Sequence, residues 1–400
     1  MVNAINISCD FVSLAATQVQ DHSESRLRDL FRLYYSNWEP EDVDLVSQRE
    51  IGFIPFFGTM VRHRSVASLR DAAALGRRIV PRHLYYSTAY YKKPDEKLMQ
   101  EKLWQGAELI FDLDADHISG SKGMTYESIL DAVKKHTIRL VERFLLGDLG
   151  FSPQDLLIVF SGGRGYHVHV RSDSVYLLNS DARREISNYI RGEGLNASDF
   201  RRMVLDVGGV AGGWRESIDR KFSGLYREAD TEQGQETLRK ILGSNSLKSF
   251  LRTGHGPSPD GTHGTKLDAF GRPGPQKYRF LDKYDLKVLE FAISEVKKEE
   301  MCEIDEPVTT DVHRLIRFPG SLHGKTGLMV KKVPVDHLKA FDPLKEAVPQ
   351  IFAEGMARVE VLSPAHVKLL GSEFAVEQGE CEINTALAIF LVSSKRAKFV

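Results

Sequence analysis

The chain has 400 residues, of which 42% are hydrophobic and 27% charged, and its formal net charge is −1. This length allows two or three domains with a large core, and the near-zero charge argues against a protein that coats nucleic acid through its overall charge. Apolar runs are too short to span a bilayer, and the amino terminus lacks a basic region followed by an apolar one, so we expect an intracellular protein without membrane segments.

Cys9, Cys302 and Cys381 are isolated in the sequence and odd in number. They match neither a disulfide framework nor the paired spacing of a metal-binding motif. This usage is typical of a reducing compartment, so we expect a cytoplasmic protein.

The first predicted elements lie between residues 25 and 76. Apolar side chains recur at helical spacing in residues 25–35, with arginines outside that stripe, which predicts an amphipathic helix. Residues 50–57 have the pattern of a strand that enters a turn. Residues 67–76 predict a short helix that ends at Gly76.

Residues 51–94 carry eight lysines and arginines against a single acid, Asp71, together with four tyrosines. Positive charge interleaved with aromatic rings suits the phosphates and bases of a nucleic acid. A solvated helix face with tyrosines in the core explains any single one of these residues equally well. The informative observation is the regional excess of charge.

Residues 107–114 predict an apolar strand that ends in Asp112 and Asp114. Successive side chains of a strand point to opposite faces, so Leu109 and Phe111 can face a core while the two aspartates project together from the other side. Their Cα atoms would lie roughly 6.6 Å apart, which lets both carboxylates converge on one or two divalent ions. Burying two like charges without a partner is costly, so a cation is the better interpretation than an exposed acidic strand end.

Strands and helices alternate after the acidic strand. A long helix is predicted over 126–146, and two buried strands over 156–161 and 166–170. Residues 174–290 are charged and helical in pattern, which predicts an inserted, mostly helical subdomain. Residues 340–400 predict peripheral helices and a strand, and they contain no motif that indicates a function.

The loop between the two buried strands contains three glycines, Ser161 and Arg164. Glycine lets backbone N–H groups approach a phosphate closely, a serine hydroxyl can donate to the phosphate, and an arginine can bind it bidentately. His167 follows at the start of the second strand, and the convergence of these residue types predicts a phosphate-binding loop. His169 faces the same way, but we interpret it as a packed or hydrogen-bonded histidine.

A third group of candidate residues lies between 305 and 327. Asp305 precedes an apolar and basic segment, which leads through a Pro-Gly turn to His323. A third acid, supplied from a distant part of the sequence, would complete an oxygen-ligand site for magnesium or manganese, which also bind substrate phosphates. Arg317 and His323 would add cationic donors for a triphosphate.

These three groups together resemble the small, catalytic subunit of archaeo-eukaryotic DNA primases. In that family a strand ending in Asp-x-Asp, a Ser-Gly-x-Arg-Gly-x-His loop and a third aspartate before Arg/Lys-x-Pro-x-Ser-x-His recur in this order. The present chain matches these motifs at 112–114, 161–167, 305 and 317–323, and the resemblance extends from about residue 25 to 335. Three amino-terminal segments also fit the family: 49–53, 62–65 and 85–90.

The resemblance implies roles for individual residues. Asp112, Asp114 and Asp305 would be the catalytic acids that hold two divalent metals, Mg²⁺ or Mn²⁺, although Asp311 lies only six residues beyond Asp305. One ion would lower the pKa of the attacking 3′-hydroxyl, and the other would neutralise the leaving pyrophosphate. The residues implied in binding the nucleoside triphosphate are Ser161, Arg164, His167, Arg317 and His323.

The resemblance also implies activity, partners and fold. The implied activity is template-directed nucleotidyl transfer, a DNA-directed RNA polymerase activity that makes short RNA primers on single-stranded DNA for replication, with deoxynucleotide incorporation as an option. A large regulatory subunit would complete a heterodimer that works with the replication machinery on the chromosome. We expect an α/β (α+β) fold with a mixed β-sheet, comprising a discontinuous core at 1–173 and 291–345, the helical subdomain at 174–290 and a peripheral segment at 346–400.

One departure from the family concerns zinc. Many members carry a cysteine and histidine cluster between the Asp-x-Asp strand and the Ser-Gly loop, but residues 115–160 contain no cysteine and only His117 and His136. A structural zinc site usually needs four ligands, so we predict no zinc. Something else would have to order the loop at 118–124.

Two other functions remain open. In a phosphatase of the haloacid dehalogenase type, Asp112 would be the nucleophile, Asp114 the acid and base, and Ser161 a phosphate ligand. That motif normally has threonine or valine where this chain has Asp116, and it leaves residues 317–323 unexplained. A non-catalytic nucleic-acid-binding module would use the basic residues of 51–94, but its clustered acids would repel phosphates.

Overall fold

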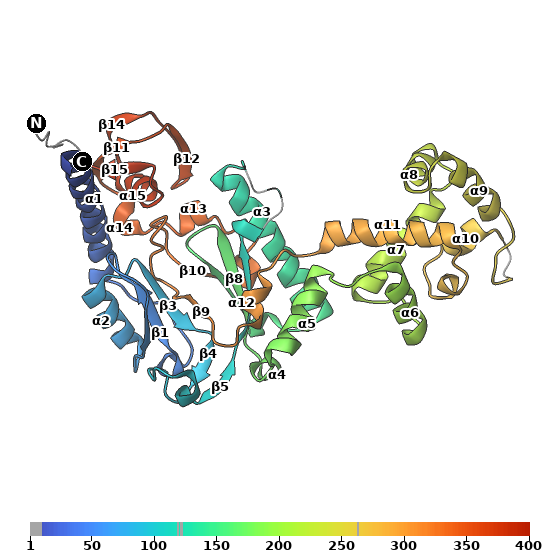
Figure 1. Cartoon of the computed structure of the whole chain (residues 1–400), viewed down its shortest axis with the longest axis horizontal. Coiled ribbons are helices and arrows are strands. Elements are labelled where there is room, and N and C mark those ends of the chain that lie inside the picture. The colour runs from blue at the N-terminus through green and yellow to red at the C-terminus, as the bar shows by residue number, and fades with distance from the viewer. Residues whose placement is uncertain (1–9, 118–119, 121–122, 262–263) are drawn as a thin grey trace, which may run out of the picture. The chain divides into compact units, whose positions relative to one another are not determined.

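The computed structural model describes residues 10–117, 120, 123–261 and 264–400. The chain forms two compact units. The first unit comprises Met1–Ile138, Ser152–Arg184 and Ile304–Val400, and the second, which we call the helical unit, comprises Arg139–Phe151 and Glu185–Glu303. Strands and helices together confirm the α/β class, while the predicted domain boundaries remain a prediction (Figure 1).

Two four-stranded sheets form the centre of the first unit (Figure 1). The strands of one sheet lie in the order β2 (Val61–Arg64), β1 (Ile51–Ile54), β3 (His83–Ser87) and β9 (Leu315–Arg317). The strands of the other lie in the order β10 (Lys331–Val333), β7 (Leu156–Phe160), β8 (Gly165–Val170) and β6 (Leu109–Asp114). Neighbours in both sheets pair antiparallel, so the expectation of a single mixed sheet is wrong in this detail.

Strand β6 has the alternation that the sequence predicts. Leu109, Phe111 and Leu113 are fully buried, whereas Asp112 and Asp114 on the opposite face keep partial exposure. Because the side chains of a strand have a period of two, one register places the apolar residues in the core and the carboxylates on the site face.

The amino-terminal helices pack beside the first sheet. Helix α1 (Asp10–Ser36) contains the predicted amphipathic stripe, and α2 (Leu69–Ile79) runs three residues past Gly76. The prediction that Gly76 ends this helix is wrong. A Cβ at Gly76 would come within 2.7 Å of the Trp38 ring, so the glycine permits a close approach between segments.

Helices dominate the middle of the chain. Helix α3 (Tyr126–Arg139) continues into a π-helical segment, Leu140–Asp148, which confirms the helix predicted over 126–146. Two further helices follow β8, namely α4 (Asp173–Tyr176) and α5 (Ser180–Arg191). The α-helices that follow α5 within the helical unit are α6 (Ala197–Val207), α7 (Gly213–Arg227), α8 (Glu232–Leu242), α9 (Ser244–Gly254), α10 (Lys266–Phe270) and α11 (Lys283–Glu300).

Buried ion pairs and hydrogen bonds stabilise the interior of the helical unit. Asp219 on α7 binds Lys277 Nζ at 2.7 Å and accepts a hydrogen bond from the Tyr278 hydroxyl at 2.9 Å. Asp285 on α11 is fully buried and binds Lys266 Nζ at 2.6 Å. Each buried charge therefore has an opposite charge beside it, which reduces the cost of burial.

The carboxyl-terminal part contains more strands than the sequence predicts. It comprises β11 (Met356–Val361), β12 (Ala365–Leu369), β13 (Ser372–Val376), β14 (Gly379–Asn384), α15 (Thr385–Ser393) and β15 (Ala397–Phe399). Helix α15 is apolar on all sides, as expected of a helix enclosed by protein, and Ala386–Ser393 are all buried. Smaller elements are β4 (Ala89–Tyr91), β5 (Trp104–Ala107), α12 (Glu306–Thr310), α13 (Pro343–Glu346) and α14 (Gln350–Ala353).

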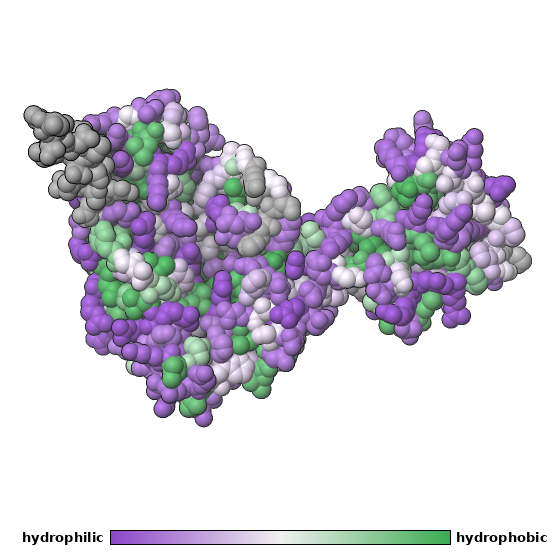
Figure 2. Space-filling model, viewed as in Figure 1, coloured by the Kyte–Doolittle hydropathy of each residue, from purple (hydrophilic) through white to green (hydrophobic). Residues whose placement is uncertain are grey.

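Hydrophilic residues cover most of the visible face of both units (Figure 2). Among the residues that the structure describes, no helix is both long and apolar enough to cross a membrane.

Candidate active site

Three aspartates converge at one end of β6. Asp112 and Asp114 project from the same face of the strand, and Asp305 lies at the start of α12, where its backbone N–H donates to the Asp112 carbonyl at 2.9 Å. Asp311 lies at the other end of α12, and its carboxylate accepts the His313 N–H at 2.9 Å. The structure thus brings Asp305, and not Asp311, beside the acidic strand.

The electrostatics of this cluster favour a cation. Burial, and then the charges of Asp114 and Asp305, raise the pKa of Asp112 to about 7. Oδ1 of Asp114 is buried and has no hydrogen-bond partner among the described residues. Repelling carboxylates with an unsatisfied oxygen fit Mg²⁺ or Mn²⁺, which prefer oxygen ligands.

The acids do not form a closed cage. In the described part of the chain, no three Asp, Glu, His or Cys side chains are gathered closely enough to hold an ion between them as they stand. Magnesium commonly takes one or two carboxylates and completes its shell with water and substrate phosphates. The arrangement therefore fits an open metal site that shares its ions with a substrate.

The predicted phosphate loop joins β7 to β8 next to the acids. Cross-strand pairing places His167 opposite Asp112 and Gly165 opposite Asp114. A Cβ at Gly165 would come within 2.4 Å of the Leu113 carbonyl oxygen, so only glycine allows the loop to approach β6 this closely. The pairing brings the loop and the carboxylates together, as the sequence predicts.

Two hydroxyl groups hold the backbone of this loop. Thr326 donates to the Gly162 carbonyl at 2.5 Å, and Tyr126 on α3 donates to the Gly163 carbonyl at 2.5 Å. The Ser161 hydroxyl accepts the Gly163 N–H at 3.3 Å. Successive carbonyl oxygens are therefore bound by the protein itself, which fixes the loop conformation before any ligand arrives.

Arg164 and His167 differ in their surroundings. The Arg164 side chain is 39% exposed and pairs with the exposed carboxylate of Asp116 at 2.7 Å. His167 is buried, and its Nε2 lies 3.6 Å from Asp112 Oδ1. Burial, together with His169 and nearby arginines, keeps the His167 pKa well below its usual range, so the ring is neutral.

His169 is a structural residue, as the sequence indicates. Its Nδ1 lies 2.6 Å from Glu108 Oε2, and both side chains are buried. The Tyr86 ring stacks on the histidine ring with a centroid distance of 6.3 Å. These contacts satisfy Nδ1 of His169, whereas its Nε2 is buried and has no hydrogen-bond partner among the described residues.

Arg317 and His323 lie on β9 and in the turn that follows it. Arg317 on β9 donates from Nη1 to His83 Nδ1 at 2.7 Å, and its guanidinium lies 5.4 Å from the centre of the Tyr85 ring. His323 packs against the loop so closely that a Cβ at Gly162 would meet the His323 Cβ at 2.7 Å. All eight predicted site residues thus lie on the elements that surround the loop and the acidic strand.

Helix α1 and Trp38, two residues after its end, support the turn that carries His323. Tyr34 and Trp38 both donate to the Gly320 carbonyl at 2.6 Å, and the Tyr35 hydroxyl accepts the Leu322 N–H at 3.1 Å. Gly320 has a φ of +80°, a conformation that glycine adopts without strain.

Sequence reasoning missed several residues of the site. His83, Tyr126 and Thr326 contact its loops directly, and the charge of Arg314 lowers the pKa of Asp112. Thr326 lies within the third group of candidate residues, only three positions after His323, and this short spacing in the sequence is a signal that could have identified it. Tyr126 and His83 have no such local signal, because their partners are distant in sequence.

The basic segment 51–94 serves partly structural roles. Arg62 binds the buried carboxylate of Glu50 at 2.9 Å, and Arg82 binds Glu24 at 3.0 Å. Three of its four tyrosines are buried. Arg62 is nevertheless exposed, as are Arg64, Arg70, Arg77 and Arg78.

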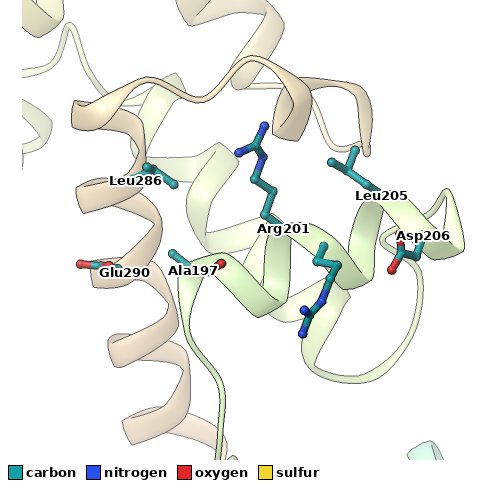
Figure 3. Close-up of a pocket in the computed structure, with 8 residues that line it drawn as sticks. Ala197, Arg201, Leu205, Asp206, Leu286 and Glu290 are labelled. Atoms are coloured by element: carbon teal, nitrogen blue, oxygen red, sulfur yellow. The ribbon is translucent and has the colours of Figure 1, made fainter.

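The helical unit contains a cavity of about 470 Å³ between α6 and α11 (Figure 3). Arg201, Leu205 and Asp206 line it from α6, and Leu286 and Glu290 from α11. The Arg201 guanidinium is already bound to the backbone carbonyl of Tyr278 at 2.7 Å. None of the predicted site residues contributes to this cavity.

Comparison with known proteins agrees with this geometry. Residues 111–336 match the family model described as DNA primase small subunit. The chain is 44% identical to the DNA primase small subunit PriS of Picrophilus torridus over 92% of this chain and 96% of the relative. It is 40% identical to that of Thermoplasma volcanium over 94% and 98%, and 37% identical to that of Methanothrix thermoacetophila over 94% and 98%.

Proposed function

The chain belongs to the family of DNA primase small subunits, and from this premise we propose that it joins ribonucleoside triphosphates into short primers on single-stranded DNA. The observation that supports this most directly is the convergence of three aspartates, a glycine-rich loop and two cationic side chains at one end of β6. Metal-assisted nucleotidyl transfer needs these three components.

The carboxylates would bind the metals. Asp112, Asp114 and Asp305 would hold two Mg²⁺ or Mn²⁺ ions, with substrate phosphates completing the coordination. When bound, the ions would activate the attacking 3′-hydroxyl and neutralise the leaving pyrophosphate. The raised pKa of Asp112 and the unsatisfied oxygen of Asp114 support this assignment.

The residues around the acids would bind the triphosphate. The β7–β8 loop, held by Thr326 and Tyr126, would present its N–H groups and the Ser161 hydroxyl to phosphate oxygens. Arg164 and Arg317 would neutralise the phosphate charge. The neutral ring of His167 and the ring of His323 would add hydrogen bonds without needing to be protonated.

The relatives are named as small subunits, which supports a large regulatory subunit as the partner in a heterodimer. We infer that the template is single-stranded DNA and that the chain acts at replication forks, with deoxynucleotides as additional substrates. The exposed arginines of 51–94 would contribute positive charge for the template.

Two earlier expectations stay predictions. The absence of zinc is one, because the chain lacks the cysteines that a structural site needs. The other is that something other than zinc orders the loop at 118–124. Residues 118, 119, 121 and 122 of this loop lie outside the described residues.

The alternatives have less support. The family and relatives named above are primase small subunits, so the comparisons offer no support to a haloacid-dehalogenase-type phosphatase. That mechanism would require a phosphoryl group on Asp112, whereas two-metal transfer requires no covalent intermediate. A purely binding module would leave three clustered aspartates without a function.

A primer-synthesis assay tests the proposal. The purified chain, with and without a large-subunit candidate, is incubated with single-stranded DNA, labelled ribonucleoside triphosphates and Mg²⁺ or Mn²⁺. We expect template-dependent oligomers that disappear in Asp112→Ala with Asp114→Ala, and Glu96→Gln, at a surface carboxylate that pairs with Lys93, serves as the control. Phosphate release without oligomers would contradict the proposal, and a trapped phosphoryl-aspartate would favour the phosphatase.

A further inference from the structure

We propose that His83 is a positioning residue, which orients Arg317 and the turn that carries His323 for binding the triphosphate. This inference rests on the proposed function. His83 carries no role in the sequence motifs, and it contacts both segments from a third element, β3.

His83 accepts two hydrogen bonds at the same ring nitrogen. Nδ1 accepts from Arg317 Nη1 at 2.7 Å and from the backbone N–H of Gly324 at 3.2 Å. An atom that accepts from two donors carries no proton, so the proton of the neutral ring is on Nε2. One nitrogen atom therefore joins the β9 arginine to the turn after His323.

The surroundings keep this acceptor neutral. His83 is 6% exposed, and burial together with Arg317, Arg82 and Lys325 lowers its pKa to about 2. The ring is thus an uncharged acceptor at neutral pH. The three positive charges favour the neutral form of the ring, and a neutral ring does not cancel any of them.

The turn packs tightly against the same position. A Cβ at Gly324 would come within 2.3 Å of Arg82 Cγ and 2.7 Å of the Arg82 carbonyl oxygen, so the turn lies directly on the residue that precedes β3. The rings of His83 and His323 meet edge to face with centroids 5.1 Å apart. A change of the His83 ring is therefore transmitted to His323 as well as to Arg317.

A histidine at this position orients Arg317 without cancelling its charge. Among the described residues, Arg317 forms no ion pair with a carboxylate, and the Tyr85 ring covers its guanidinium at 5.4 Å. An aspartate in place of His83 would also accept the hydrogen bond, but it would neutralise the arginine. The neutral acceptor leaves the full charge available to an anionic ligand.

Three substitutions separate these effects. His83→Asn keeps a neutral acceptor near the Nδ1 position, His83→Leu removes the acceptor, and His83→Asp keeps an acceptor but adds a negative charge. The readouts are kcat and KM for the nucleotide in primer synthesis. We expect His83→Leu to raise KM about tenfold with a small effect on kcat, since one buried hydrogen bond and one orientation are lost. His83→Asn should stay within about threefold of wild type, and His83→Asp should raise KM more than His83→Leu.

Binding of tripolyphosphate, measured by calorimetry on the wild type and the same variants, makes the test independent of synthesis. If the wild type binds tripolyphosphate and His83→Leu weakens the binding while His83→Asn does not, the inference stands even when no primer is made and the proposed function fails. A wild type that binds no tripolyphosphate overturns the inference. Equal effects of His83→Asn and His83→Asp on tripolyphosphate binding overturn it too. If His83→Leu does not fold, the comparison of these two variants is the test.

Discussion

Glu108 and Arg49 form an ion pair in which neither side chain is exposed to solvent, with Arg49 Nη2 2.6 Å from Glu108 Oε1. Arg171 Nε also binds Glu108 at 2.9 Å, and the Tyr90 hydroxyl donates to it at 3.1 Å. Glu108 immediately precedes β6, so this buried cluster fixes the start of the strand that ends in the two aspartates. Arg49, then His169 and Arg171, hold the Glu108 pKa well below its usual range despite its burial.

Replacing Glu108 by glutamine should reduce the free energy of unfolding by about 3–5 kcal/mol, because the fully buried Arg49 and the partly buried Arg171 would lose their counter-charge. Guanidinium chloride unfolding followed by circular dichroism measures the change. Glu96→Gln is the control, since Glu96 pairs with Lys93 on the surface at 3.9 Å, and it should stay within about 0.5 kcal/mol. Equal losses in the two variants would contradict a structural role for the cluster.

Asp112→Asn should have opposite effects on stability and on activity. Without metal, the substitution removes one of three clustered negative charges, so it should raise the free energy of unfolding by about 1 kcal/mol. Primer synthesis should fall by about a hundredfold or more, because a metal ligand is lost. Unfolding in EDTA and in Mg²⁺ checks this, and Mg²⁺ should stabilise the wild type more than the variant. Equal Mg²⁺ stabilisation would contradict the metal assignment.

Tyr126→Phe should raise KM for the nucleotide roughly fivefold to tenfold, because the loop would lose one hydrogen bond to the Gly163 carbonyl. The matched control is Tyr166→Phe. Tyr166 is buried on β8, but its hydroxyl has no hydrogen-bond partner among the described residues, so its removal should leave KM unchanged. Steady-state kinetics with varied nucleotide concentration distinguish the two, and identical behaviour would mean that the Tyr126 hydroxyl does not position the loop.

Cys302 should make the helical unit sensitive to alkaline pH. Burial raises the pKa of its thiol to about 12, whereas an unfolded cysteine has a pKa of about 8.5. The stabilising effect of the neutral thiol is complete below pH 8.5 and is lost as pH rises toward 12. Between pH 8 and 10 the wild type should lose about 2 kcal/mol more than Cys302→Ala. Denaturant unfolding at both pH values measures this, and parallel losses in the two proteins would refute it.

The elements predicted best are those with local signals. The alternation of Leu109 to Asp114 and the glycines of 161–165 restrict the backbone within a few residues, and both motifs take the predicted form. Gly76 misled the prediction, because a glycine that ends a helix and one that admits a neighbouring ring look alike in sequence.

Contacts that join distant segments could not be predicted. His83 and Arg317 are 234 positions apart, and Tyr126 meets the loop through a helix whose sequence indicates only amphipathicity. The charge count of 51–94 also overstated the free charge, because Glu50 and Glu24 lie outside the segment and bind Arg62 and Arg82. Such pairs depend on strand order and packing, which residue spacing does not encode.

Helix α15 gives the end of the chain an influence on its middle. The Phe390 ring packs edge to face on Tyr126 at 5.2 Å, and Ile389 lies so close to Gly327 that a Cβ there would come within 2.2 Å of Ile389 Cγ2. A polypeptide that stopped before Thr385 would keep every aspartate and every loop glycine. It would lack the side chains of α15 that pack against Tyr126 and beside Thr326, whose hydroxyls hold the loop. Premature termination or a disruptive fusion at this end would therefore loosen the proposed phosphate-binding loop while leaving the aspartates in place in the sequence.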